Sequence, residues 1–181
     1  MIRISTLRHS VRILLLVWTS WVAFVYPVLA DNDLADNPKP NVQLSTDSAT
    51  PRQVEDTTQK AIVRDYTAAW VALTNALANN QPGALDASFT GVARDELAAR
   101  IADQRKSGLR TEIRDRGHRL EAIVYTPEGS AMQLHDTAQV DLQIMDGGKA
   151  IHSEHVTLHY AVLMTVAEDR WKVRLMQERG F

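Results

Sequence analysis

Three of the four histidines in the last third of the chain, His135, His155 and His159, are the first residues whose type and spacing could do chemistry. His155 and His159 are four residues apart, a spacing that makes a metal-binding pair on a helix. They lie, however, in a run that alternates apolar and polar residues, where four residues span roughly 13 Å and cannot share one metal. The expected strand pairing instead places His135 opposite His159, with about 5 Å between their Cβ atoms. Zinc would need further ligands there, so we predict no metal site and no cofactor.

The strand interpretation rests on three amphipathic runs, over residues 132–144, 156–166 and 171–175. Each is typical of a half-buried antiparallel strand. If the apolar sets share one face, the first turn needs an odd loop, Asp146-Gly147-Gly148, and the second needs the two-residue loop Glu168-Asp169. The first loop also pairs Thr137 with Thr157 and Gln139 with His155. We predict a polar contact face formed by His135, Thr137, Gln139, His155, Thr157 and His159.

The preceding part of the chain predicts helices followed by one more strand. A stripe of apolar and aromatic residues at helical spacing predicts a helix from Asp56 or Thr57 to the stop near Asn79. A short second helix over 84–89 and a third from Thr90 to Gly108 follow. Residues 109–125 predict a strand. Because the helices precede a continuous antiparallel sheet, the sequence predicts an α+β fold with four strands.

Composition restricts the partners that the chain can have. It has 181 residues, no cysteine and a formal net charge of −2. Without cysteine, neither disulfides nor thiol chemistry is available. The acidic balance beyond the first thirty residues, without a basic stripe, argues against nucleic acid as a partner.

The first thirty residues predict an export signal. Arg3, Arg8 and Arg12 precede an apolar run over 13–30, and Val28-Leu29-Ala30 offers a cleavage site. The alternative is an uncleaved membrane anchor through 13–30. Both alternatives place the rest of the chain outside the cytoplasm, in the periplasm or cell envelope.

Residues 31–55 predict a disordered linker, because they are rich in Asn, Asp, Ser, Thr and Pro and lack periodicity. The folded domain is therefore predicted over 56–181. The loops offer no phosphate-binding motif or nucleophile elbow, and no acid and base can be paired from their spacing. We accordingly predict no catalytic residue.

The order of elements carries several landmarks of a known superfamily. They are Tyr66 and Trp70 in the first helix, Phe89-Thr90-Gly91, Ser107-Gly108, and a strand at 159–163 followed by a turn and Trp171-Lys172-Val173. Over residues 57–178 these resemble the nuclear transport factor 2-like superfamily. That resemblance implies helices packed into a curved sheet, a cone that in some members holds a pocket. Its members include lyase- and isomerase-type enzymes and non-catalytic envelope domains that bind proteins.

The resemblance implies two alternative functions for this chain. The favoured one is a tethered, non-catalytic domain of the cell envelope that docks a protein partner or forms a homodimer. The alternative is a small-ligand-binding protein or an enzyme of the lyase or isomerase type, in which Asp65, Asp136 or His118 would face an enclosed cavity. The residues that such a pocket would use are Asp65, Tyr66, Trp70, Asp136, Tyr160 and Trp171.

Overall fold

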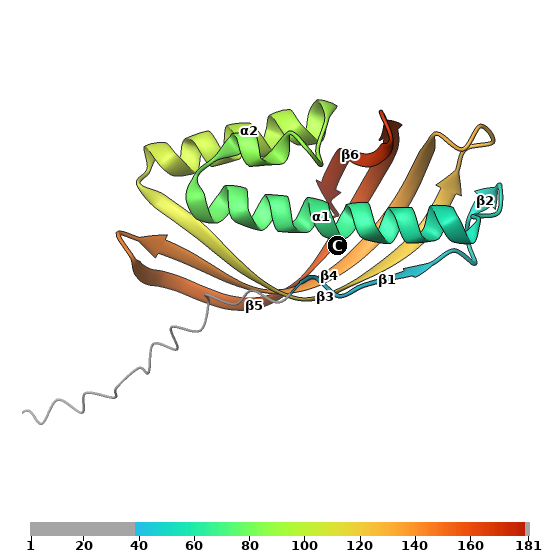
Figure 1. Cartoon of the computed structure of the whole chain (residues 1–181). Coiled ribbons are helices and arrows are strands. Elements are labelled where there is room, and N and C mark those ends of the chain that lie inside the picture. The colour runs from blue at the N-terminus through green and yellow to red at the C-terminus, as the bar shows by residue number, and fades with distance from the viewer. Residues whose placement is uncertain (1–38, 180–181) are drawn as a thin grey trace, which may run out of the picture. The chain divides into compact units, whose positions relative to one another are not determined.

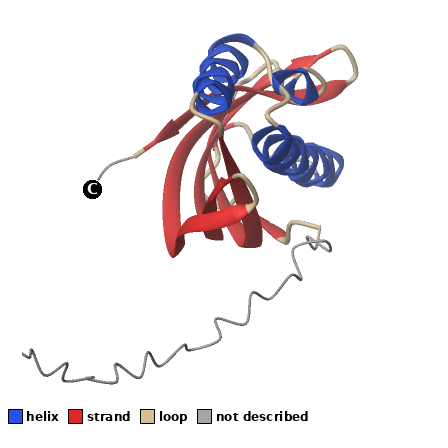
Figure 2. Ribbon diagram, turned by 90° about the vertical axis from the view of Figure 1, so that its left-hand side faces the viewer, coloured by secondary structure: helices blue, strands red, loops and turns tan. Residues whose placement is uncertain are grey.

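The computed structural model describes residues 39–179, all of which belong to one compact unit. Two helices pack on one face of a mostly antiparallel sheet of six strands, as predicted for an α+β fold (Figures 1 and 2). The sheet order is β1-β3-β4-β5-β6, with β2 also paired to β3. In chain order the elements are β1 (Val42–Ser45), β2 (Thr50–Pro51), α1 (Asp56–Asn79), the 3₁₀ turn η2 (Pro82–Leu85), α2 (Gly91–Lys106), β3 (Leu109–Tyr125), β4 (Ala131–Asp146), β5 (Lys149–Ala167) and β6 (Arg170–Glu178).

The helices begin and end close to the predicted residues. Asn80 takes a left-handed conformation with φ of 54° and closes α1 through its N–H, which donates to the Ala76 carbonyl. Gly108, with φ of +72°, follows α2. Both residue types tolerate this conformation better than others, so the chain turns there without strain. The predicted second helix over 84–89 is instead the shorter turn η2.

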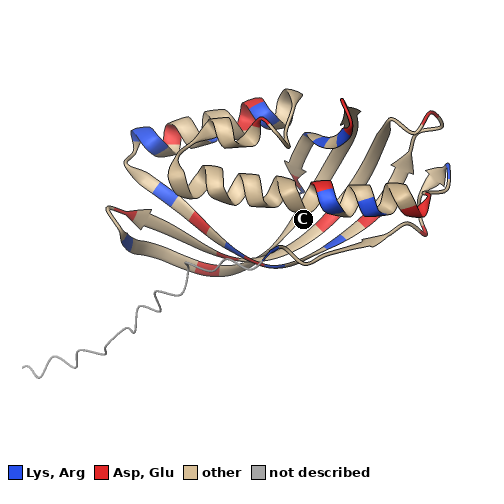
Figure 3. Cartoon of the chain, in the orientation of Figure 1, with Lys and Arg blue, Asp and Glu red and all other residues tan. Residues whose placement is uncertain are grey.

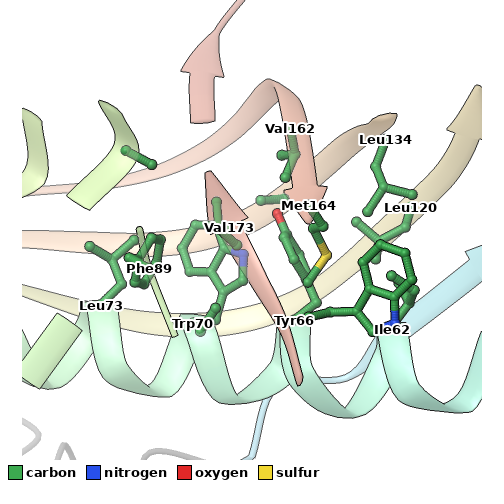
Figure 4. Close-up of a cluster of buried hydrophobic side chains, with 14 of the residues drawn as sticks. Ile62, Tyr66, Trp70, Leu73, Phe89, Leu120, Leu134, Val162, Met164 and Val173 are labelled. Carbon is green, nitrogen blue, oxygen red and sulfur yellow. The ribbon is translucent and has the colours of Figure 1, made fainter. Parts of the chain in front are cut away.

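The core forms where the apolar stripe of α1 meets the inner face of the sheet (Figure 4). Tyr66 and Trp70 are among its largest buried side chains. They pack with residues from β3, β4, β5 and β6, so this one helix holds the strands in a single layer. The labelled members of the cluster are Ile62, Tyr66, Trp70, Leu73, Phe89, Leu120, Leu134, Val162, Met164 and Val173.

The register of the first hairpin differs from the prediction by two residues. Asp146 pairs with Lys149 across the two-residue loop Gly147-Gly148, and a bulge at Ile151 follows. The bulge adds one residue, so the apolar faces still coincide, but the predicted three-residue loop is wrong. The predicted partners are also wrong: the observed pairs are His135 with Ala161, Thr137 with His159, Gln139 with Thr157, and Asp141 with His155.

The second hairpin has the predicted loop, with Ala167 paired to Arg170. A bulge between the Leu163 and Met164 pairs then shifts the rest of β6. Glu178 therefore lies opposite Tyr160.

The prediction of a linker over 31–55 is wrong for its second half, because β1 and β2 form within this range. Both strands pair in parallel with β3, and Val42 lies opposite His118. Their side chains are few and at most half-buried, so the hydrogen bonds to β3 stabilise them more than burial does. The sheet consequently has two strands more than predicted.

Candidate functional site

A cluster of charged and polar side chains lies inside the apolar core. His118 of β3 lies between two carboxyl groups: its Nε2 is 2.5 Å from Asp115 Oδ2 and its Nδ1 is 2.9 Å from Asp136 Oδ2. The Tyr66 hydroxyl of α1 donates to the same Asp136 oxygen at 2.7 Å. The side chains of His118 and Asp136 are wholly buried, and that of Asp115 is 2% exposed. We call Asp115, His118, Asp136 and Tyr66 the inner cluster.

A bulge in β3 brings Asp115 and His118 to the same face. Residues three apart in a regular strand point to opposite faces. Here Asp115 pairs with Val140 and Gly117 with Gln139, so Arg116 is an extra residue and restores the same side for both. Gly117 has φ of +142°, and the carbonyl of Asn41 lies 3.7 Å from the position of a Cβ at this residue. That distance is an ordinary van der Waals contact, so it is the positive φ of Gly117, and not crowding by β1, that favours glycine here.

The His118 imidazole of the inner cluster is protonated at neutral pH. Burial lowers the pKa of His118, but hydrogen bonds to Asp115 and Asp136, together with their negative charge, outweigh it and raise the pKa to about 9. At neutral pH both ring nitrogens therefore donate to carboxyl oxygens. Burial and the charge of Asp136 raise the pKa of Tyr66 well above its usual value, so its hydroxyl stays protonated.

Aromatic rings cover the inner cluster on the helix side. The Trp70 ring lies 4.3 Å from the His118 ring, centroid to centroid, and Tyr160 contacts Trp70 edge-on at 6.0 Å. Asp136 Oδ1 is buried and has no hydrogen-bond partner in residues 39–179. Trp70 Nε1 is also buried and makes no hydrogen bond of good geometry there, although its N–H is close enough to the Tyr66 hydroxyl to lower the pKa of Tyr66. Tyr160, which is half-buried, is the member of this set nearest to solvent.

The predicted pocket residues separate into two groups. Tyr66, Trp70, Asp136 and Tyr160 meet at the inner cluster. Asp65 and Trp171 meet elsewhere: Asp65 Oδ2 accepts the Trp171 backbone N–H at 2.9 Å, and Arg64 donates to both oxygens of Asp65. Asp65 thus fixes the start of β6, which is a structural role. Whether the first group holds a ligand stays a prediction.

Sequence reasoning missed Asp115 as a member of the inner cluster. Asp115 and His118 are three residues apart, and in a regular strand an odd separation places two side chains on opposite faces. Gly117, a glycine inside a strand pattern, is the signal that could have indicated the bulge.

The outer face of the sheet carries the six residues predicted as a contact face. His155 Nδ1 lies 2.8 Å from Asp141 Oδ1, and Arg116 Nε donates to the other Asp141 oxygen at 2.6 Å. These hydrogen bonds, that of Arg116 first, lower the pKa of Asp141. Thr137 Oγ1 and His159 Nδ1 are 3.3 Å apart. Acidic and basic residues are interspersed along the strands (Figure 3).

Neither region forms a metal site by its geometry. No group of three or more His, Cys, Asp or Glu side chains in the described part of the chain is arranged to hold a metal ion. In the inner cluster the two carboxyl groups lie on opposite nitrogens of one imidazole and cannot converge on an ion.

In residues 39–179 no helix is long and apolar enough to cross a membrane. The predicted signal or anchor over 13–30 lies outside the described residues.

An open hollow of about 630 Å³ lies between β1 and α1, away from the inner cluster. Its apolar lining includes Val42, Leu44 and Val63, and Lys39 and Lys60 contribute positive charge. Sequence reasoning did not indicate this hollow, because β1 was not predicted.

The fold is similar to that of the intermembrane space region of the chloroplast protein ARC6, with a TM-score of 0.58. The identity is 14%, and the match covers 71% of this chain and 98% of that one. Looser matches are the protein Aln2 from a Streptomyces species (TM-score 0.45, 12% identity, 68% and 90% of the two chains) and a de novo designed β-sheet protein (TM-score 0.35, 18% identity, 67% and 92%).

No protein-family model and no curated protein matches the sequence. The likeness to the ARC6 region shows a shared fold, which is consistent with the predicted nuclear transport factor 2-like cone.

Proposed function

We propose that the chain is an extracytoplasmic domain of the cell envelope that docks a protein partner through the outer face of its sheet. The observation that carries this proposal is the one-sided arrangement of the layers. Both helices lie on the inner face, and in residues 39–179 no element covers the outer face (Figure 2). That face offers hydroxyl, amide and imidazole groups on long strands that the core holds rigid, which suits a polar protein contact.

The inner cluster supports a non-catalytic role. A general acid or base must come within about 3 Å of the group with which it exchanges a proton. His118 instead uses both nitrogens for Asp115 and Asp136, and its side chain has no exposed surface. It therefore serves the core and is not presented to a substrate.

Two further observations support the location. The basic and apolar start of the sequence resembles an export signal or anchor, and the similar fold of the ARC6 region occurs in an intermembrane space. A reporter enzyme that folds only outside the cytoplasm, fused after residue 181, should be active. An inactive fusion, with an active cytoplasmic reporter at the same position, would contradict the location.

Site-specific photo-crosslinking in cells tests the docking face. A photoreactive residue at Gln139 or Thr157, both exposed on the outer face, should give one discrete protein adduct, and the same residue at Glu96 of α2 should not. Thr137→Arg should abolish the adduct by adding a large charge to the face, while the control Asp95→Arg on α2 should preserve it. Equal adducts from both faces, or none from the outer face, would exclude the proposal.

The ligand-binding alternative is favoured by one specific observation: in residues 39–179 the buried Asp136 Oδ1 lacks a partner, and the buried Trp70 Nε1 makes no hydrogen bond of good geometry. If a small molecule can reach them, water can as well. Hydrogen exchange of the Trp70 indole N–H, followed by NMR, separates the alternatives: exchange within minutes supports a pocket, and protection over hours contradicts one.

A further inference from the structure

The hollow between β1 and α1 lies at an edge of the sheet. β1 is the terminal strand of the sheet order and runs beside α1 (Figure 1), and no strand in residues 39–179 pairs with its other edge. Such an edge is a template for a further strand, and proteins commonly block it with charged residues, proline or a bulge. β1 has the sequence Val-Gln-Leu-Ser and carries none of these. A further strand can therefore pair with β1 over its short length.

Two residues of β1 direct their backbone groups to this free edge. The Asn41 carbonyl accepts a hydrogen bond from the His118 N–H at 2.9 Å, so Asn41 faces β3. Because backbone groups alternate along a strand, Gln43 also faces β3, whereas the N–H and C=O groups of Val42 and Leu44 point away from it. Each of these two residues thus offers one donor and one acceptor to an added strand, and no hydrogen bond within the chain has to break.

The lining of the hollow indicates which side chains an added strand would carry. Val42 and Leu44 of β1 and Val63 of α1 form a half-buried apolar surface. Lys39 and Lys60 are exposed, and neither forms an ion pair or a hydrogen bond in residues 39–179. No Asp or Glu of the described residues lines the hollow. The complementary strand therefore carries apolar side chains with carboxylates beside them, which would meet the two lysines.

The dimensions and the chemistry of the hollow favour one kind of occupant. Its lining residues cover roughly 17 Å of strand over 39–44, which is the length of about five extended residues. A helix would leave the outward groups of Val42 and Leu44 unpaired, because its own backbone groups are already bonded to each other. A second copy of this edge would bring Lys39 and Lys60 against the same lysines, and like charges disfavour that contact.

We propose that an extended segment of a partner protein, with alternating apolar and acidic residues, adds as a strand to the edge of β1 and fills this hollow. Backbone hydrogen bonds to Val42 and Leu44 supply the affinity, and the lysines with the apolar lining select the side chains. The contact uses the edge of the sheet and not its outer face, so it is independent of the docking proposed above.

A defined peptide tests the charge complementarity. The probe is acetylated, amidated and fluorescent Asp-Thr-Val-Thr-Val-Thr-Asp, whose Asp and Val side chains share one face of a strand. Fluorescence anisotropy should show saturable binding to the full chain. Lys60→Glu should weaken this binding at least tenfold, whereas the control Lys149→Glu, at the exposed hairpin of β4 and β5, should not change it. No binding to the natural chain, or an equal loss in both variants, would overturn the proposal.

A charge exchange separates a direct contact from a change in the fold. The same peptide with Lys in place of each Asp should bind the natural chain at least tenfold more weakly than the acidic peptide does. It should bind the Lys60→Glu variant more tightly than the acidic peptide does. If both peptides keep the same order of affinity for both chains, Lys60 does not contact the bound segment and the proposal fails.

N-methylated peptides test the addition of a strand. Alternate residues of an extended peptide direct their N–H groups to opposite edges, so methylation of the Val amides and methylation of the Thr amides block different edges. One of the two methylated peptides should lose binding and the other should keep it. Loss with the Val amides indicates an antiparallel strand, and loss with the Thr amides a parallel one. An equal effect of both methylations would contradict strand addition.

Crosslinking identifies the occupant of the hollow. A diazirine in one Val side chain of the peptide should give adducts within residues 42–44 or 59–67, and adducts confined to other parts of the chain would contradict the proposal. A diazirine residue at Val63 of the full chain, without peptide, should give neither a dimer nor an intrachain adduct with residues before Lys39. Either product would assign the hollow to that occupant and overturn the proposal. Outer-face adducts from Gln139 would persist in each case, so this inference and the proposed docking function fail separately.

Discussion

Among residues 39–179, two histidines pair with aspartates in opposite surroundings. His118 lies between Asp115 and Asp136 with no exposed side-chain surface. His155 lies beside Asp141 on the outer face, where 62% of the His155 side chain and 27% of the Asp141 side chain are exposed. Distances in the two pairs are alike, 2.9 Å for His118 to Asp136 and 2.8 Å for His155 to Asp141.

The difference teaches that geometry alone does not determine what such a pair does. In the core, removal of either the imidazole or its carboxyl partners would leave an uncompensated buried charge. The members of the inner cluster therefore stabilise the fold only together. On the surface, water and salt screen the attraction, and the pair contributes little to stability. A change in the outer pair should therefore cost little stability, whereas a change in the inner one should cost much.

His118→Ala should give the largest effect, because it leaves two buried carboxyl groups without their donor. We expect the free energy of unfolding to fall by about 3–5 kcal/mol, measured by urea denaturation. A loss below about 1 kcal/mol would mean that water reaches the inner cluster and that the contrast with His155 is false.

The stability of the natural chain should depend on pH through His118. Its pKa is about 9 in the fold against about 6.5 when unfolded, so its stabilising effect is complete below pH 6.5 and is lost as the pH rises through 9. The free energy of unfolding should fall over this window by at most about 1.4 kcal/mol per pH unit. In His118→Gln this slope should be absent; a slope that persists would assign the effect to other groups.

Tyr66→Phe removes one donor from Asp136 and keeps the ring in place. Because Asp136 Oδ1 already lacks a partner in residues 39–179, we expect a loss of about 1–3 kcal/mol in the same denaturation assay. An unchanged stability would show that the hydroxyl contributes nothing to the inner cluster. Thr58→Val, at a half-buried position outside the inner cluster, is a matched control for the loss of one hydroxyl.

His155→Ala should have the smallest effect on stability, below about 1 kcal/mol, because its partner Asp141 keeps Arg116. If the outer face docks a partner, the same change should still weaken the photo-crosslink from Gln139. A large loss of stability would place His155 with His118 and remove the distinction between the two pairs.

The sequence predicted which face of the sheet a side chain occupies better than it predicted which residues pair across strands. Both a three-residue loop with regular strands and a two-residue loop with a bulge keep the apolar residues of β4 and β5 on one side. The hydrophobic pattern therefore placed Leu134 and Val162 correctly inside, but it could not distinguish registers that differ by two residues. His159 consequently lies opposite Thr137 and not opposite His135.

The inner cluster was only partly predictable for a related reason. Asp136 stood out as a polar residue on an apolar face, and the helical stripe indicated Tyr66. Asp115 depends on the bulge at Arg116, which leaves only a weak signal in Gly117. Similarly, β1 offers just Val42 and Leu44 as apolar residues, too few for periodicity to show a strand.

Three elements meet at one buried imidazolium: β3 carries His118 and Asp115, the next strand β4 carries Asp136, and the distant helix α1 carries Tyr66, which donates to Asp136. A chain in which β3 has docked on the helix before β4 arrives would hold the charge half-compensated in an apolar environment. Such partly assembled states are therefore costly and sparsely populated. The consequence is cooperativity: helix and sheet should form and melt together, and circular dichroism and tryptophan fluorescence should report one coincident transition.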